Sequence, residues 1–212
     1  MFRKLLEKLG LKKSVEEPSP VKKVYKPLPK GKVIAKILGG YDVEFMYEDG
    51  DEDPGICPVC HNVLKKIPNL DYRMQRRKGD VFYTYDMFCI VTEKFKKFCE
   101  TNRYEGLKFT VLPKSPGYYY FESEKTFKVY LIKGRSEFGP KRRCCNQYDY
   151  ITRGHLYKYK NYCLQTDDFI CCTDYWFGCY NQKKPTYIVG LKTAGKMRKA
   201  GISGIYFDDV ME

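Results

Sequence analysis

Histidine is scarce in this sequence, and its scarcity limits the chemistry that the chain can perform. Only His61 and His155 are present in 212 residues. His155 could act as a base for Cys163, but the sequence supplies no third group to orient the imidazole. Phosphate-binding loops, the dinucleotide-binding glycine pattern and the zinc-protease helix motif are also missing. We therefore expect a binding protein and not an enzyme.

Long apolar runs are missing as well. No stretch approaches the roughly 18 apolar residues of a transmembrane helix, and the opening MFRKLLEKLGLKK contains no apolar segment of the kind that secretory signals need. Ten cysteines in a secreted protein would indicate a disulfide framework. Without a secretory signal we expect a cytoplasmic protein whose cysteines are reduced, metal-bound or buried.

The positive charge is concentrated near the N-terminus. Residues 1–36 carry 11 Lys and Arg against 3 Asp and Glu, whereas residues 37–212 carry 28 against 23. The first 31 residues read as a basic tail, in which a short amphipathic helix built on Phe2, Leu5, Leu6 and Leu9 precedes a linker rich in proline and lysine. This helix would lie on a membrane surface or a partner, or it would fold back on the body or fray. We expect the folded body to span residues 32–212.

Aromatic residues are abundant, with 20 Tyr and 13 Phe, and they favour strands. The segment VIAKILGGYDVEFMY predicts two strands that turn at Gly39 and Gly40. The segment YYYFESEKTFKVYLIK predicts another strand pair, which turns across Ser123 to Lys125. The single tryptophan, Trp176, is expected in the core.

An internal repeat is the most informative feature of the body. Residues 90–112 align without a gap to residues 188–210, with identities at Ile90/Ile188, Val91/Val189, Lys94/Lys192, Gly106/Gly204 and Phe109/Phe207. Each copy predicts a strand, a helix and a second strand. An aromatic segment that opens on an acid precedes each copy, so the two units extend over about residues 80–112 and 168–210.

The two predicted helices differ in detail. In the first copy Thr92 is suited to be the N-cap, and Phe95, Phe98 and Cys99 form one apolar face. In the second copy Gly190 replaces the cap, and Ala194, Met197 and the pair Ala200/Gly201 make a flatter face.

The sequence CPVC, from Cys57 to Cys60, is the strongest chemical motif. Two residues between thiolates allow a tight turn to aim both sulfurs at one tetrahedral ion, and zinc is the usual structural ion of such sites. Two further ligands are needed. Cys144 and Cys145 are the next candidates, although adjacent side chains diverge in most backbones. His61, His155 and Cys163 are alternatives, and reduced or buried thiols without metal remain a competing interpretation. We expect the other cysteines, Cys89, Cys99, Cys171, Cys172 and Cys179, to be small core residues.

Basic residues interleaved with aromatic ones suggest a second class of partner. They occur at Arg73, Arg76, Arg77 and Lys78, and at Lys141, Arg142 and Arg143 beside Tyr148 and Tyr150. Such clusters suit phosphate contacts and base stacking. They equally suit an acidic protein surface, or solvated loops.

Several segments together resemble the double-CxxCG-motif proteins, a family that overlaps with immunity proteins of bacterial polymorphic toxin systems. They are CPVCH, the paired I-V-x-x-K and G-x-x-F units, CNQY and DFICCTDYWFG. The resemblance covers roughly residues 32–210. It implies a cytoplasmic protein that neutralises a cognate toxin by binding it. The second motif departs from the family pattern, because Arg142 stands at its first cysteine and Asn146 at its glycine.

The sequence therefore predicts an α+β fold. We expect a mainly antiparallel sheet, two related strand-helix-strand units and a zinc-ribbon-like insert that holds a structural zinc ion through Cys57, Cys60, Cys144 and Cys145. The expected function is that of a toxin-binding immunity protein. The alternative is a basic nucleic-acid-binding or regulatory zinc-ribbon module.

Overall fold

Strands dominate the part of the chain that the computed structural model describes, which is residues 31–48, 53–75, 77–132, 135–159 and 166–212. The elements in chain order are β1 (Val33–Val43), β2 (Val81–Thr84), β3 (Cys89–Thr92), α2 (Glu93–Thr101), β4 (Leu107–Val111), β5 (Tyr118–Ser123), β6 (Thr126–Phe127), β7 (Val129–Tyr130), β8 (Tyr150–Ile151), β9 (Leu156–Lys158), β10 (Ile170–Cys179), η1 (Tyr180–Gln182), β11 (Lys184–Gly190), α3 (Leu191–Lys199) and β12 (Ile205–Met211). This sheet-dominated arrangement agrees with the expected α+β class.

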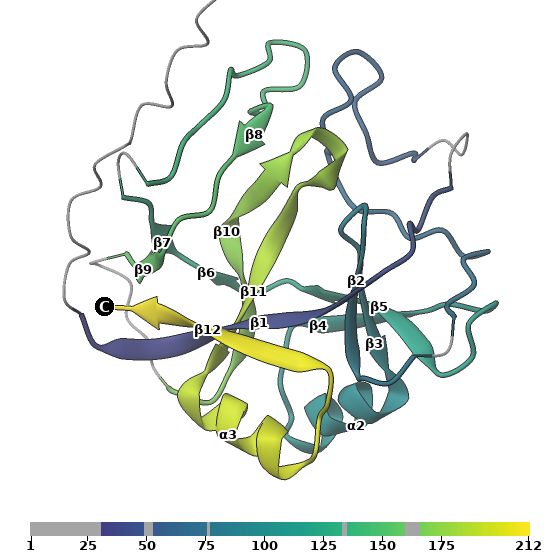
Figure 1. Ribbon diagram of the computed structural model, residues 1–212, viewed down its shortest axis with the longest axis vertical. Helices are drawn as coiled ribbons and strands as arrows, with labels where there is room; N and C mark the ends of the chain where they lie inside the picture. The colour runs from purple at the N-terminus through teal and green to yellow at the C-terminus, as the bar shows by residue number, and fades with distance from the viewer. Residues whose placement is uncertain (1–30, 49–52, 76, 133–134, 160–165) are drawn as a thin grey trace, which may run out of the picture.

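The strands form one curled, mixed sheet in the order β4-β5-β3-β2-β1-β11-β10-β6, and β12 pairs with β1 and β9 beside this path. Most pairs are antiparallel, while β1–β2, β10–β6 and β12–β9 are parallel. Figure 1 shows both α-helices at one end of the sheet and the long β10–β11 hairpin reaching to the other end.

The two repeat copies fold alike. Helices α2 and α3 begin at residues 93 and 191 and end at residues 101 and 199, so both are displaced by the same 98 positions. In each unit the helix follows one strand along the chain and precedes another. In the sheet, a third strand lies between these two. That strand is β5 between β3 and β4, and β1 between β11 and β12.

The chain leaves both helices in the same way. The N–H of Tyr104 donates to the carbonyl of Cys99 at 3.1 Å, and the N–H of Ile202 donates to the carbonyl of Met197 at 3.0 Å. The residue before each donor has a positive φ, 54° at Arg103 and 65° at Gly201. These are the bonds of a Schellman ending. The repeated sequence therefore specifies the same helix and the same exit turn twice.

Both helices pack on one core, because their apolar faces meet the same side of the sheet. Phe95 and Phe98 of α2 join Ala194 and Met197 of α3 in a single buried cluster around Phe121. The Oγ1 of Thr92 accepts the N–H of Phe95, which confirms the predicted N-cap, whereas Gly190 caps α3 without a side chain. The prediction that Ala200 and Gly201 belong to the apolar face of this helix was wrong, because both residues are exposed and lie beyond the helix end.

Two aspartates accept hydrogen bonds across the contact between the two repeat units. Asp80, before β2, accepts the N–H and hydroxyl of Ser203 from the second unit, at 2.8 and 3.0 Å. Asp168, before β10, accepts the hydroxyl of Tyr104 from the first unit at 2.7 Å. The acids that open the two aromatic segments thus have corresponding roles.

Two predicted hairpins are wrong. The segment around Gly39 and Gly40 is one continuous strand, β1, because these glycines serve close packing. A Cβ on Gly39 would lie 2.1 Å from the Tyr206 ring, and a Cβ on Gly40 would lie 2.5 Å from the carbonyl oxygen of Val81. The second segment does not fold back on itself either, since β5 pairs with β3 and β4 while β6 pairs with β10.

Several predictions fall outside the described residues. The basic tail of residues 1–31, apart from Gly31, is among them, together with Arg76 and Cys163. Within the described part of the chain, no helix combines the length and the apolar character needed to cross a membrane.

Candidate metal centre

The first cysteine pair lies in a short hairpin. Ile56 and Val63 form an isolated antiparallel bridge, and the N–H of Cys57 donates to the carbonyl of Asn62 at 2.8 Å. The turn closes with a bond from the N–H of His61 to the carbonyl of Cys57 at 2.9 Å, and His61 has a φ of 58°. This is the tight turn that the CPVC spacing predicts.

The second cysteine pair lies in a hairpin with the same bonds. Lys141 and Tyr148 form the bridge, and the N–H of Arg142 donates to the carbonyl of Gln147 at 2.8 Å. The N–H of Asn146 donates to the carbonyl of Arg142 at 2.9 Å, and Asn146 has a φ of 59°.

The two hairpins correspond residue by residue at a displacement of 85 positions, the separation between Cys60 and Cys145. By this correspondence Arg142 occupies the place of Cys57, and Cys144 occupies the place of Val59. The second hairpin therefore supplies the sulfur of Cys144 from a position inside the turn. This unusual turn allows two adjacent cysteines to reach the same cluster.

All four predicted sulfurs come together. The Sγ atoms of Cys57, Cys60, Cys144 and Cys145 lie within 4.8 Å of one another. The Cys57–Cys144 distance is 4.0 Å and the Cys60–Cys145 distance is 3.5 Å. Around a tetrahedral ion with metal–sulfur bonds of about 2.3 Å, sulfurs stand roughly 3.8 Å apart. The spacing fits one ion with four thiolate ligands.

The protonation of the cluster also suits a cation. The backbone N–H of Asn62 is the main cause that lowers the pKa of Cys60 to about 6. The pKa of Cys144 is raised to about 12, chiefly by its contact with the Cys60 sulfur. Without a cation, the Cys60 sulfur therefore carries a negative charge at neutral pH, while Cys144 and Cys145 keep their protons. A bound metal ion would displace those protons, because thiolates and not thiols are the ligands.

A network of polar residues, most of them buried, forms hydrogen bonds next to the cysteine cluster. The side-chain amide of Asn62 donates to the Sγ of Cys60 at 3.4 Å and to the Oδ1 of Asp149 at 3.1 Å. Lys183 donates to the Oδ1 of Asn62 at 2.7 Å, and Arg142 holds Asp149 through two contacts of 2.7 Å each. Such outer contacts fix ligand orientation. The ammonium of Lys183 also offsets part of the negative charge of four thiolates.

The backbone of one residue, Tyr180, joins both hairpins to the sheet. The carbonyl of Tyr180, at the tip of the β10–β11 hairpin, accepts the N–H of Val63 at 3.2 Å. The N–H of Tyr180 donates to the carbonyl of Asp149 at 2.8 Å. The cysteine cluster is therefore fixed to the end of the sheet that lies away from the helices (Figure 1).

The other metal-ligand candidates lie elsewhere. In the described part of the chain, the only group of three or more potential ligand side chains that could hold an ion is the four-cysteine cluster. His61 follows Cys60 but is exposed, and His155 lines a separate surface depression. Cys89, Cys99, Cys171 and Cys172 are buried as expected. The expectation was wrong for Cys179, which is exposed, and for Trp176, which is only half-buried.

The predicted basic clusters are partly neutralised. Arg77 pairs with Glu44, Arg142 with Asp149, and the ammonium of Lys141 lies 5.4 Å from the centre of the Tyr148 ring. These contacts reduce the charge that either cluster offers to phosphate.

A further basic surface, which the sequence reasoning missed, lies between the two helices, and three of its lysines, Lys94, Lys97 and Lys196, pair with Asp80, Glu93 and Asp168. We call it the helix groove. It has a volume of about 490 Å³, and its described lining holds four lysines and no carboxylate, namely Lys94, Lys97, Lys196 and Lys199 over Phe98, Ala200 and Ile202. The signal was present in the sequence, because each helix carries two of these lysines three positions apart, on one face.

The chain matches no family model, and no curated protein matches it.

Proposed function

We propose that this chain is a cytoplasmic immunity protein, which binds and neutralises a cognate toxin of a bacterial polymorphic toxin system. The observation that carries the proposal is the four-cysteine cluster at the tip of the sheet. A site in which the protein fills all four tetrahedral positions leaves no place for a substrate, so such sites are structural. We therefore assign the cluster to stiffening a binding scaffold, with zinc as its ion.

The hairpin geometry supports the family resemblance behind this proposal. A second CxxC motif with arginine at its first position would be expected to have lost its metal. Here Cys144 brings a fourth sulfur back to the cluster while Arg142 binds Asp149. The altered motif is thus compatible with a double-knuckle site. The two like strand-helix-strand units further support an origin by duplication.

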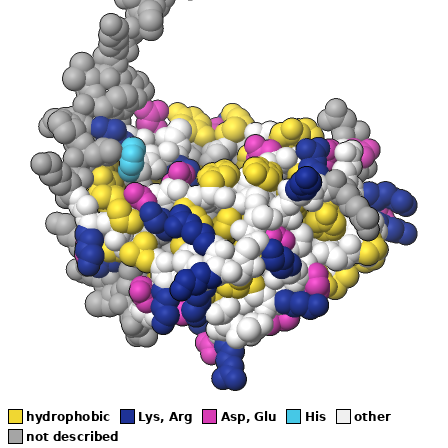
Figure 2. All heavy atoms as spheres, turned by 60° about the horizontal axis from the view of Figure 1, so that its bottom comes forward, with side chains coloured by type: hydrophobic (Ala, Val, Ile, Leu, Met, Phe, Trp, Pro, Cys, Tyr) yellow, Lys and Arg dark blue, Asp and Glu magenta, His cyan; other side chains and the backbone are white. Residues whose placement is uncertain are grey.

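The helix groove is the surface that we propose for the partner. Lys97 and Lys199 are exposed there, and the side chain of Lys97 is 70% exposed. Figure 2, which turns the helical end toward the viewer, shows Lys and Arg side chains across this face with Asp and Glu between several of them. An apolar floor framed by lysines fits an acidic, amphipathic element of a protein partner.

The same groove favours one other candidate, the nucleic-acid-binding module. Phosphate binding by several lysines weakens steeply with added salt, because it releases condensed counterions. A packed protein interface depends much less on salt. Titrations at about 50 and 200 mM salt therefore separate the two candidates.

The decisive test of the immunity function uses a toxin encoded beside this gene. Co-expression should protect cells from that toxin, and the two purified proteins should elute as one complex. The double variant Lys97→Glu/Lys199→Glu should weaken the complex at least about tenfold, because it reverses two charges in the groove. The double variant Lys65→Glu/Lys114→Glu, at exposed positions away from the groove, is the matched control. Absence of both protection and complex, together with salt-sensitive binding of RNA or DNA, would replace the immunity function with the second candidate.

A further inference from the structure

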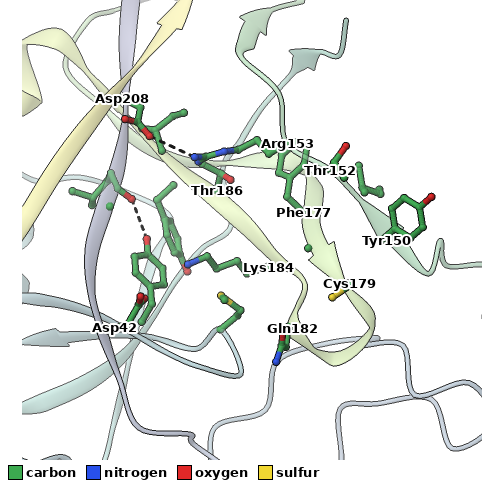
Figure 3. Close-up of a pocket in the computed structure, with 18 of the residues that line it drawn as sticks. Asp42, Tyr150, Thr152, Arg153, Phe177, Cys179, Gln182, Lys184, Thr186 and Asp208 are labelled. Atoms are coloured by element: carbon green, nitrogen blue, oxygen red, sulfur yellow. Dashed lines mark hydrogen bonds and ion pairs between the residues drawn. The ribbon is translucent and has the colours of Figure 1, made fainter. Parts of the chain in front are cut away.

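A cleft of about 670 Å³, separate from the metal centre, lies along the β10–β11 hairpin. Strands from both halves of the sheet form its walls, with Asp42 from β1, Tyr83 from β2, Phe177 from β10, Lys184 from β11 and Asp208 from β12. Figure 3 shows Asp42, Phe177, Lys184 and Asp208 around the cleft. The volume falls within the range of about 300–1,000 Å³ that small-molecule sites occupy.

Lys184 is the unusual residue of this cleft. Alternation along β11 places Lys184 on the same side as Thr186, and both line the cleft. Its Nζ lies 3.0 Å from the centre of the Tyr83 ring. Among the described residues, no hydrogen bond or carboxylate contact is made by this Nζ, in contrast to Lys66 and Lys183, which donate to carbonyl or amide oxygens. The ammonium therefore lies against an aromatic ring at the cleft, with the Asp42 carboxylate close enough to raise its pKa.

A second cation faces the same space. Arg153 lies in Figure 3 near Asp208, and its Nη2 is 3.5 Å from the Oδ2 of Asp208. Both partners are partly exposed, so this pair is loose and leaves most of the guanidinium donors available.

The charges of the two cations act on each other. Burial lowers the pKa of Lys184 to about 8; Cys89 and Asp42 oppose this effect, while the positive charge of Arg153 adds to it. An anion held near both groups would relieve the repulsion and replace the hydration that burial removes.

Aromatic side chains make up much of the remaining wall. Tyr83, Tyr150, Phe177, Tyr187 and Tyr206 all line the cleft. Tyr83 and Tyr187 are buried, with their hydroxyls engaged by the carbonyls of Leu38 and Phe121, whereas Tyr150 and Tyr206 are exposed and offer ring surface to a ligand. Flat apolar surface of this kind favours a ligand with an aromatic body.

We infer that the cleft is a binding site for a small aromatic anion, whose acidic group lies against Lys184 and Arg153 and whose ring packs on the tyrosines. This site is separate from the cysteine cluster and from the helix groove. It goes beyond the proposed immunity function and does not depend on it.

The test uses the full chain and the aromatic sulfonate 8-anilinonaphthalene-1-sulfonate, whose fluorescence rises in apolar sites. The protein should bind it saturably, and benzoate should displace it. Lys184→Met keeps the aliphatic stem but removes the charge, and Arg153→Gln removes the second cation. Each should weaken binding about tenfold, which corresponds to the loss of one charge-assisted hydrogen bond. Lys114→Met, at an exposed position outside the cleft lining, should have no effect.

Two further measurements make the result decisive. Binding to the wild type should fall as the pH rises through about 8, because the Lys184 amine loses its charge there, and Lys184→Met should not show this dependence. Orthophosphate as competitor tests whether the acidic group alone suffices, and the proposal expects it to compete far less well than benzoate. Equal binding by wild type, Lys184→Met and Arg153→Gln would overturn the proposal, as would no binding at all. If Lys184→Met does not fold, Arg153→Gln decides alone.

Discussion

Arg142 shows how one residue can change a metal motif without removing the site. It stands where the first hairpin has Cys57, with the same backbone bonds, yet its side chain turns to Asp149. Its pairing with the buried carboxylate lowers the pKa of Asp149, since the hydrogen bond from Arg142 is the largest cause. The adjacent Cys144 then supplies the sulfur that Arg142 lacks.

The first prediction concerns these ligands. Elemental analysis of the purified protein should find about one zinc per chain. Cys57→Ser and Cys144→Ser should each lose most of the metal and lower the melting temperature, because the free energy of metal binding is part of the free energy of folding. Adding Arg142→Cys to Cys144→Ser should restore zinc, since position 142 corresponds to position 57.

The control for this series is Cys179→Ser, which changes an exposed cysteine outside the cluster. It should keep full metal content and normal stability. Metal-free wild-type protein of unchanged stability would rule out the zinc centre. Failure of Arg142→Cys to restore binding would instead show that the two hairpins are not equivalent.

At the scale of elements, β1 connects the two halves of the sheet. It separates β11 from β12 in one unit, and its last residues pair in parallel with β2 of the other unit. Gly40 lies where the strand passes from one partner to the next, and its missing side chain lets the Val81 carbonyl approach.

The second prediction tests this junction. Gly40→Ala should destabilise the protein by about 1–3 kcal/mol, because the new Cβ would press on backbone atoms that cannot move without separating the strands. Gly195→Ala is the matched control. Its Cβ would meet nothing within 4 Å inside α3, so it should stabilise the protein by up to about 1 kcal/mol. Urea unfolding measures both, and a neutral Gly40→Ala would contradict the account of β1.

At the scale of the whole molecule, Asp80 and Asp168 hold the two units together. Burial favours the protonated form of both acids, but hydrogen bonds outweigh it. Those from Ser203 and Thr92 lower the pKa of Asp80, and those from Lys196, Tyr104 and Thr193 lower the pKa of Asp168. Both carboxylates therefore stabilise the folded state when they are charged.

The third prediction follows from the sign of these shifts. A carboxyl group whose pKa is lower in the folded state than in the unfolded state, where it is near 3.8, stabilises the protein above that value. The stabilisation is lost as the pH falls through the lower, folded pKa. Asp80→Asn and Asp168→Asn should thus be less stable than wild type at pH 7, and the difference should shrink below about pH 4. Melting temperatures across this range measure the effect, and exposed Asp71→Asn serves as the control. A difference independent of pH would argue against the charge as its cause.

Local patterns were sufficient for part of the fold and the site. The Thr92 cap, the apolar face of α2 and the CPVC turn depend on residues a few positions apart, so their physics can be read directly from the chain. The repeat gave the second strand-helix-strand unit because equal spacing of equal residues implies equal structure. By contrast, Gly39 and Gly40 fit a turn as well as a close contact, and only the position of Tyr206 and Val81 distinguishes the two.

The sequence by itself determined that this protein has two like units and a first cysteine knuckle, because short-range spacing fixes helices and tight turns. The tertiary structure decided that Cys144 and Cys145 both reach the cluster, that the lysines of two distant helices share one groove, and that Lys184 faces a cleft beside Arg153. These are contacts between segments remote in the chain. Their formation depends on how the whole sheet curls and packs, which no local pattern records.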